Sequence, residues 1–373
     1  MFESPPVWMY FVGFLLLLGP LVTVHELGHY LVGRWFGVKA EAFSVGFGKE
    51  IAGRTDKHGT RWRLAALPLG GYVQFRGDMN PASIPNPDAP AVEGSFQSAA
   101  LWKRALIVAA GPVTNLLVAI AILAALFAIY GERVTSNPEA SVTIGAFGEE
   151  SAARDAGMQI GDRITAIDGV EVVEFGDIVR QVALYPDQQL TIDALRDGEA
   201  MSFTMTTDRV VQEDGFGNEG TVGRIGVGPM EFEFEQRPVA AARLVPLAAW
   251  TCWDMTKMMV VGIKQILFGE RSVKELGGPI KIAKYSGERL SLGLTEFVYF
   301  AALISLNLAF INFLPIPALD GGHLAFYAAE AIRRKPAGPD ATEWAYRTGI
   351  AFVLVFMVIV TWNDIASLLP FGS

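Results

Sequence analysis

Two histidines and a glutamate near the start of the chain form the pattern with the clearest chemical meaning. They stand in the run His25-Glu26-Leu27-Gly28-His29. In a helix, residues four apart lie on one face, so His25 and His29 can bind one metal ion. Glu26 lies beside the first ligand, where its carboxylate can act on a water held by that metal. The pattern therefore predicts the metal site of a hydrolase.

The residues before this motif are apolar enough to lie in a membrane. No charged residue occurs from Val7 to Val24. A surface helix could carry the motif by accident, but a buried apolar helix would have to desolvate all three polar groups. Ionisable residues within a membrane segment therefore indicate function by default. Together, the motif and its setting predict hydrolysis inside the bilayer.

The composition of the 373-residue chain is typical of a polytopic membrane protein with a soluble insert. Hydrophobic residues make up 51% and charged residues 18%, and the mean hydropathy is +0.33. The net charge of -9 argues against a nucleic-acid partner. The single cysteine, Cys252, excludes an intramolecular disulfide and a cysteine-rich zinc site, and we interpret it as a small apolar residue. The first apolar run lacks a basic leader and exceeds the length of a signal peptide core, so we expect it to be retained.

Four apolar runs are long enough to cross a bilayer, at residues 7–36, 105–130, 297–313 and 349–369. The third contains Asn307 and Asn312 and continues into Pro315 and Pro317. Interrupted helices at membrane depth are tolerated where they line a cavity. Lys and Arg are concentrated between the first and second runs and between the third and fourth. The positive-inside rule then places both of these loops in the cytoplasm, and both termini and the long insert outside.

The insert, at about residues 135–236, has the pattern of a small α+β domain. We expect strands at 141–144, 162–169 and 225–227, helices at 151–156 and 175–184, and a hairpin of 190–195 with 201–206. Residues 153–164, which include Gly157 as a helix C-cap, resemble a PDZ domain of the bacterial periplasmic kind. A generic α/β domain is the alternative. Residues 239–267, within a helical segment at 237–295, are amphipathic and lie either on the outer membrane surface or against the insert.

A third metal ligand must come from another part of the chain. Catalytic zinc usually has three protein ligands and an open position, and the first helix offers no third one. His58 lies in a polar turn, where we expect it to be solvated. Asp320 and His323 follow the interrupted end of the third apolar run. We favour Asp320 as the ligand, whereas His323 could bind the metal or support the site.

The combination of residues 25–29 with residues 312–321 resembles the site-2 protease family of intramembrane zinc metalloproteases. The layout of four spans with a PDZ-like insert resembles its bacterial regulator-of-sigma-E protease branch. Further matches to the family are Gly111-Pro112-x-x-Asn115, Ser305-Leu306-Asn307-Leu308 and Gly277-Gly278-Pro279-Ile280. The chain departs from some members in having one PDZ-like domain where they have two, which leaves open how substrates are screened.

The resemblance implies a role for each residue of the site. His25, His29 and Asp320 would bind Zn²⁺, with Glu26 as the general base and later the proton donor. Asn312 would hold the substrate backbone or the oxyanion. Weaker candidates for the same task are Asn307 and Asn115, and hydrogen bonding between helices explains Asn115 at least as well.

A helical substrate hides its peptide bonds, so it must be unwound before cleavage. Addition of the substrate to an exposed strand edge would achieve this. The candidate strand includes Gly46, Phe47 and Gly48, in a region at about 40–76 where the family has a membrane-re-entrant β-hairpin. We also expect residues 63–75 to form a hairpin around Gly70. An ordinary amphipathic cytoplasmic hairpin is the alternative interpretation of this region.

The sequence therefore predicts a polytopic α-helical membrane protein with a β-hairpin region and an inserted periplasmic PDZ domain. Its parts would be residues 1–130, 135–236, 237–295 and 296–373. The resemblance implies a protease of the bacterial inner membrane, with its active site near the cytoplasmic side. It would cleave single-pass proteins already cut by another protease, such as anti-sigma factors and remnant signal peptides. The alternatives are an inactive PDZ scaffold and a zinc transporter, although spans one and four offer few polar sites for transport.

Overall fold

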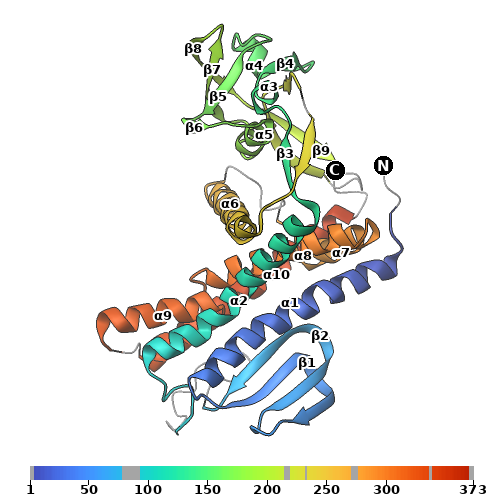
Figure 1. Ribbon diagram of the computed structural model, residues 1–373. Coiled ribbons are helices and arrows are strands. Elements are labelled where there is room, and N and C mark those ends of the chain that lie inside the picture. The colour runs from blue at the N-terminus through green and yellow to red at the C-terminus, as the bar shows by residue number, and fades with distance from the viewer. Residues whose placement is uncertain are drawn as a thin grey trace. The chain divides into compact units, whose positions relative to one another are not determined.

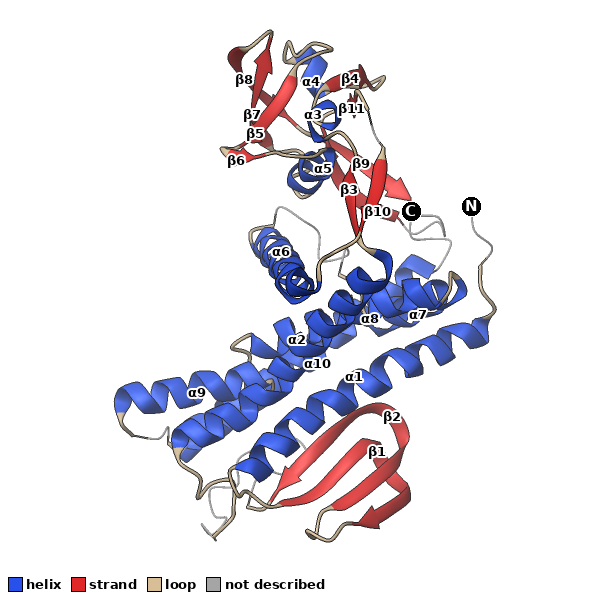
Figure 2. Cartoon of the chain, in the orientation of Figure 1, coloured by secondary structure: helices blue, strands red, loops and turns tan. Residues whose placement is uncertain are grey.

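The structure is a computed structural model that describes residues 4–77, 93–213, 219–231, 233–269, 276–335 and 338–368. The chain divides into two compact units, which are described separately (Figure 1). The helical unit contains residues 5–125, 245–256 and 276–373. The insert unit contains residues 1–4, 126–244 and 257–275. Figure 2 shows that helices dominate the first and strands the second.

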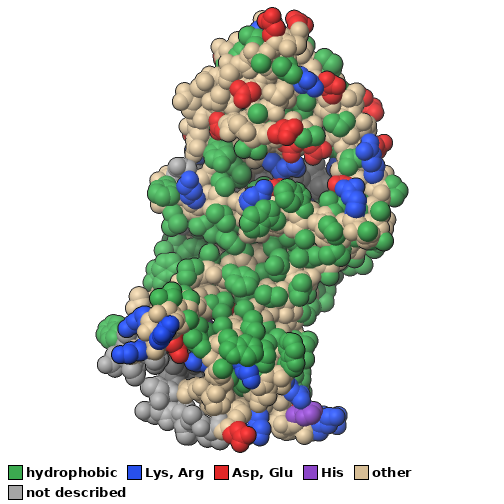
Figure 3. Space-filling view, turned by 60° about the vertical axis from the view of Figure 1, so that its left-hand side comes forward, with side chains coloured by type: hydrophobic (Ala, Val, Ile, Leu, Met, Phe, Trp, Pro, Cys, Tyr) green, Lys and Arg blue, Asp and Glu red, His purple; other side chains and the backbone are tan. Residues whose placement is uncertain are grey.

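The described residues include four helices that are long and apolar enough to cross a membrane: α1 (Val7–Trp35), α2 (Leu101–Tyr130), α8 (Leu294–Phe313) and the segment Thr342–Ser367 of α10 (Pro339–Leu368). They confirm the four predicted spans. The last helix begins ten residues before the expected start at 349, and Leu369 lies outside the described residues. Hydrophobic side chains cover much of the surface of this unit (Figure 3). Such a surface is stable only in contact with lipid or another apolar partner.

A sheet of two long strands, β1 (Ala40–Thr55) and β2 (Arg61–Phe75), packs against α1 (Figure 2). Ala42 pairs with Arg61 on one side and with Gln74 on the other. The first half of β1 therefore lies between the two halves of β2, and the end of β2 forms an edge. The predicted hairpin at 63–75 is wrong, because the chain continues there as one strand. It turns instead before β2, where Gly59 has a φ of +87°.

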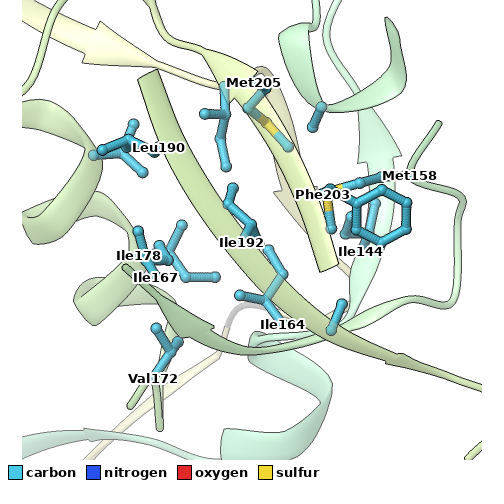
Figure 4. Close-up of a cluster of buried hydrophobic side chains, with 14 of the residues drawn as sticks. Ile144, Met158, Ile164, Ile167, Val172, Ile178, Leu190, Ile192, Phe203 and Met205 are labelled. Atoms are coloured by element: carbon cyan, nitrogen blue, oxygen red, sulfur yellow. The ribbon is translucent and has the colours of Figure 1, made fainter. Parts of the chain in front are cut away.

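The insert unit contains a four-stranded antiparallel sheet in the order β6-β5-β7-β8. The strands are β5 (Arg163–Ile167), β6 (Val170–Glu171), β7 (Gln189–Arg196) and β8 (Glu199–Thr206). Asp197 and Gly198 both have positive φ, as the two-residue turn of the predicted hairpin requires. Helices α4 (Ala152–Asp155) and α5 (Phe175–Ala183) lie where the sequence predicts them. Ile164, Ile192 and Phe203 belong to the apolar core of this unit (Figure 4).

Two predictions for the insert unit are wrong. Most of the strand expected at 141–144 is absent, because Asn137 caps a short helix, α3 (Pro138–Ser141), and β4 (Ile144–Phe147) begins only after it. The strand expected at 225–227 is shifted along the chain: β11 (Val227–Pro229) begins at the last of these residues and, within the described part of the chain, pairs with β4. The sequence also missed two strand pairs, β9 (Asp208–Glu213) with β10 (Glu219–Arg224) and β3 (Glu132–Thr135) with β12 (Phe234–Arg237).

Three further helices complete the described chain. The amphipathic segment, for which one or two helices were expected, forms a single long helix, α6 (Ala241–Leu267). In the helical unit, α7 (Pro279–Ser291) follows the Gly277–Pro279 break, and α9 (Asp320–Arg333) follows α8. A Cβ atom on Gly13 of α1 would lie 2.8 Å from the backbone of Ser286 in α7. The two helices can approach this closely only because glycine stands at the contact.

Candidate metal centre and active-site pocket

The metal-binding motif lies on one face of α1. His25 and His29 are one helical turn apart, and their Nε2 atoms lie 3.2 Å from each other. The rings meet edge to face, with an interplanar angle of 82°. His25 is buried and His29 nearly so. Both lie in α1, whose residues before the motif carry no charge. Both imidazoles therefore point inward at a common position.

Asp320 reaches this position from the first turn of α9. Its Oδ2 atom lies 3.2 Å from His25 Nε2 and 3.4 Å from His29 Nε2. The tight turn before it places Ala318 at a φ of 84°. Gly321 and Gly322 fold back on that turn, and a Cβ on either would collide with backbone atoms of residues 313–317. The run that follows span three thus fixes Asp320 opposite the two histidines.

The three side chains fit a zinc ion. Zinc bound tetrahedrally at roughly 2.0–2.1 Å would hold its ligand atoms about 3.3 Å apart, as in this arrangement. Asp320 Oδ2 is buried without a hydrogen-bond partner among the described residues, which is costly unless a cation is bound. Two imidazoles and one carboxylate also match the donor set of catalytic zinc sites. His323 is not part of this cluster.

Helix α2 packs against the two histidines. The Nδ1 of His29 lies 2.8 Å from the carbonyl oxygen of Ile107, to which it donates when Nε2 binds metal. A Cβ on Gly111 would collide with Nε2 of His29 and lie 2.7 Å from Nε2 of His25. Asn115 is buried, with its side-chain amide 3.2 Å from Nδ1 of His25. The motif containing Gly111 and Asn115 was recognised in the sequence, but its contact with the two histidines was not predicted.

A cavity of about 240 Å³ opens at the three ligands. Glu26 faces it and accepts a hydrogen bond from the backbone N–H of Val73. Residues 71–75 of β2 line the same cavity, and a Cβ on Gly71 would lie 3.4 Å from Cγ of Glu26. The edge of the sheet therefore lies beside the expected general base. The sequence missed this edge because Gly70-Gly71 suggested a turn, whereas both residues belong to a continuous strand.

The other predicted site residues are distributed differently. Asn312 lines the cavity, and its Nδ2 donates to the carbonyl of Leu308 at 2.9 Å. Asn307 is not among the residues that line the cavity. Gly46, Phe47 and Gly48 are likewise absent from that lining.

His58 and His323 have different roles from a metal ligand. The backbone N–H of His58 donates to Asp56 in the turn between β1 and β2, and its side chain is exposed. His323 lines the cavity one turn after Asp320. Its Nδ1 lies 2.5 Å from the hydroxyl of Tyr346 in α10, which fixes the orientation of the ring.

Asp56 anchors the sheet to the helix that carries the motif. It accepts hydrogen bonds from the indole N–H of Trp62 and the hydroxyl of Tyr30, one residue after His29. Desolvation alone would raise the pKa of Asp56. The hydrogen bonds from Trp62, from the backbone N–H groups of His58 and Thr60, and from Tyr30 outweigh it and lower that pKa to about 2. The ionised carboxylate therefore holds the sheet near the metal ligands at neutral pH.

Comparison with known proteins agrees with this geometry. The profile of a family described as Peptidase family M50 matches residues 13–356. A protein of Rhizobium meliloti, named as a candidate zinc metalloprotease, is 44% identical over 94% of this chain and 95% of its own. A protein of Agrobacterium fabrum with the same kind of name is 41% identical over 96% of both chains. Metalloprotease MmpA of Caulobacter vibrioides is 34% identical over 95% of this chain and 94% of its own.

Proposed function

Since the chain belongs to peptidase family M50, the site-2 proteases, and is a zinc metalloprotease of the membrane, we propose that it cleaves peptide bonds within the transmembrane segments of single-pass proteins. The observation that carries this proposal is the position of His25, Glu26 and His29 within α1, an apolar helix of spanning length. A soluble protease has no reason to bury its zinc ligands in such a helix. We therefore infer that the peptide bond cleaved at this site comes from within the membrane.

Each polar residue of the cavity has a separate role in the proposed hydrolysis. His25, His29 and Asp320 would hold zinc, which when bound would polarise the peptide carbonyl and make water more acidic. Glu26 takes a proton from the attacking water and later gives it to the leaving amine. Asn312 lines the cavity, and the N–H of its amide that is not donated to Leu308 would donate to the oxyanion. The apolar surroundings strengthen each of these interactions.

The edge of β2 is the proposed binding site for the unwound substrate. Arg76 directly follows β2, and its N–H donates to the carbonyl oxygen of Lys39, which directly precedes β1. The even-numbered residues at this end of β2 therefore direct their backbone N–H and C=O groups toward β1. Backbone groups alternate sides along a strand, so those of Gly71, Val73 and Phe75 point to the free edge. The hydrogen bond from Val73 N–H to Glu26 agrees with this direction. A substrate strand added here would lie directly along the cavity.

The finer assignments follow the positive-inside rule and the family resemblance. We place the protein in the bacterial inner membrane, with both termini and the insert unit in the periplasm. The insert unit is then a PDZ-like domain that selects substrates, either by binding a new C-terminus or by excluding bulky periplasmic domains. Substrates would be anti-sigma factors or remnant signal peptides already trimmed by another protease. Charge distribution supports this orientation, because Lys and Arg gather between spans one and two and between spans three and four.

Substitution of Val73 by proline tests the role of the edge. Proline is tolerated on an edge strand but has no N–H, so it removes the donor that Val73 gives to Glu26 in the structure and would give to an added substrate strand. We expect Val73→Pro to reduce cleavage of a reconstituted single-pass substrate by at least tenfold while one zinc per chain is retained. Val73→Ala keeps the N–H and should cleave at nearly the normal rate. Normal cleavage by Val73→Pro would exclude substrate binding at this edge.

A further inference from the structure

The side-chain amide of Asn115 has an arrangement that cannot persist when zinc is bound. The residue is 1% exposed, and its Nδ2 lies 3.2 Å from Nδ1 of His25. Its Oδ1 is buried without a hydrogen-bond partner among the described residues. The amide thus turns its donor group to the histidine and leaves its acceptor unsatisfied.

Metal binding determines whether Nδ1 of His25, which faces the Asn115 amide, carries the ring proton. Nε2 of His25 points at Asp320 and His29, so its lone pair must bind the ion. The ring proton then lies on Nδ1, which needs an acceptor. The two ends of a carboxamide have nearly the same shape, so a half-turn of the amide exchanges its nitrogen and oxygen. This half-turn removes a donor–donor contact and gives Oδ1 a partner.

We propose that Asn115 is the positioning residue of His25. Its oxygen accepts the Nδ1 proton and so fixes the tautomer and the ring orientation that present Nε2 to zinc. The proposal rests on the zinc site but concerns a residue to which the proposed cleavage mechanism assigns no step.

The spacing along α2 supports this role. Ile107, Gly111 and Asn115 are four residues apart and therefore share one helix face. Ile107 supplies the acceptor for His29, and Gly111 leaves room for the two Nε2 atoms. Asn115 supplies the acceptor for His25. One face of α2 thus provides an outer partner for each imidazole, with a gap between them.

A contact with α8 fixes the backbone at this position. The hydroxyl of Ser305 is fully buried and donates to the backbone carbonyl of Asn115 at 2.7 Å. This bond does not use the side-chain amide, so it persists when the side chain is changed. Two motifs noted in the sequence, at residues 111–115 and 305–308, therefore meet in one support for His25.

Zinc affinity measured by competition with a chelator, on the full-length protein in detergent, tests the proposal. Asn115→Leu has a similar volume but no acceptor, and we expect it to bind zinc about 10- to 100-fold more weakly. Asn115→Asp can only accept, and we expect it to bind zinc at least as tightly as the wild type. The proposal is overturned if Asn115→Leu binds normally, or if Asn115→Asp loses as much affinity as Asn115→Leu.

Ser305→Ala serves as the packing control. It removes the bond between α8 and α2 but leaves the amide in place, so we expect a lower melting temperature and zinc affinity within about threefold of normal. A loss in Ser305→Ala equal to that in Asn115→Leu would assign the effect to helix packing and contradict the proposal. Because the readout is zinc affinity, a failure here leaves the proposed proteolysis untouched, and absence of proteolysis leaves this result interpretable.

Discussion

At the scale of single residues, the centre depends as much on an absent side chain as on those present. Gly111 lies against the nitrogens of both histidines, in space that any β-carbon would occupy. The ligands themselves could be predicted from the sequence, because the spacing of His25 and His29 is set by helix geometry alone. Asp320 was one of several candidates, and only the fold of the turn before α9 brings it into place.

Replacing Gly111 by alanine tests this requirement. The added methyl group would lie 2.7 Å from Nε2 of His25 and still closer to Nε2 of His29, so the two rings must move apart. We expect Gly111→Ala to lose at least tenfold in zinc affinity, measured by chelator competition. Gly19→Ala on α1, where an added Cβ would meet nothing within 4 Å, is the matched control and should bind normally. Equal affinity in the two variants would show that the space at Gly111 does not matter.

At the scale of elements, α7 is held by a carboxylate from another helix. Asp364 of α10 is buried and accepts hydrogen bonds from the backbone N–H groups of Gly278, Ile280 and Lys281. It satisfies the first turn of α7 as a capping side chain would, although it lies some 80 residues away in sequence. Local patterns cannot reveal such a partner, so the sequence of residues 277–280 did not predict it.

Loss of the Asp364 carboxylate should loosen α7. Asp364→Leu leaves three donors unsatisfied, and we expect the docking of α7 to weaken by about 1–3 kcal/mol. A cysteine placed at Ser286, which is fully buried, should then react faster with a maleimide. Trp362→Leu, at a site 70% exposed, controls for substitutions in the same helix. An unchanged rate in Asp364→Leu would show that other contacts hold α7.

The position of the β2 edge could not be predicted from the sequence. The sequence indicated strands at 40–76, but it placed the substrate edge near Gly46 and a turn near Gly70. The first half of β1 pairs with β2 along both of its edges. This pairing depends on contacts between residues far apart in the sequence, such as Ala42 with Gln74. A single sequence does not contain that register. In the insert unit, by contrast, Asp197-Gly198 defined its hairpin because the turn chemistry is local.

At the scale of the whole molecule, the two units face different constraints. The helical unit must place His25, His29 and Asp320 in an apolar setting, where a zinc ion would compensate the carboxylate charge. The insert unit contains an ion pair between the buried Asp162 and the partly exposed Arg196. Asp162 is 1% exposed and receives two hydrogen bonds at 2.7 Å from Arg196. These bonds from Arg196 lower the pKa of Asp162 below its ordinary value.

This ion pair predicts an acid dependence of the insert unit. A carboxyl whose pKa is lower in the folded state stabilises the fold above its unfolded pKa of about 3.9, and the stabilisation is lost as the pH falls through the folded pKa. We expect Asp162→Asn to melt at a lower temperature at pH 7 by calorimetry. Its melting temperature should also fall less than that of the wild type between pH 5 and pH 2. Parallel curves for the two proteins would contradict this assignment.

The most direct test of the central claim is cleavage by purified protein in liposomes, with a single-pass substrate and mass spectrometry of the products. We predict that the wild type with one zinc per chain cuts a bond inside the transmembrane segment, and that a chelator abolishes the cut. Glu26→Gln should keep its zinc and cut nothing. Cleavage by Glu26→Gln, or a cut found only outside the membrane segment, would contradict intramembrane proteolysis at this site.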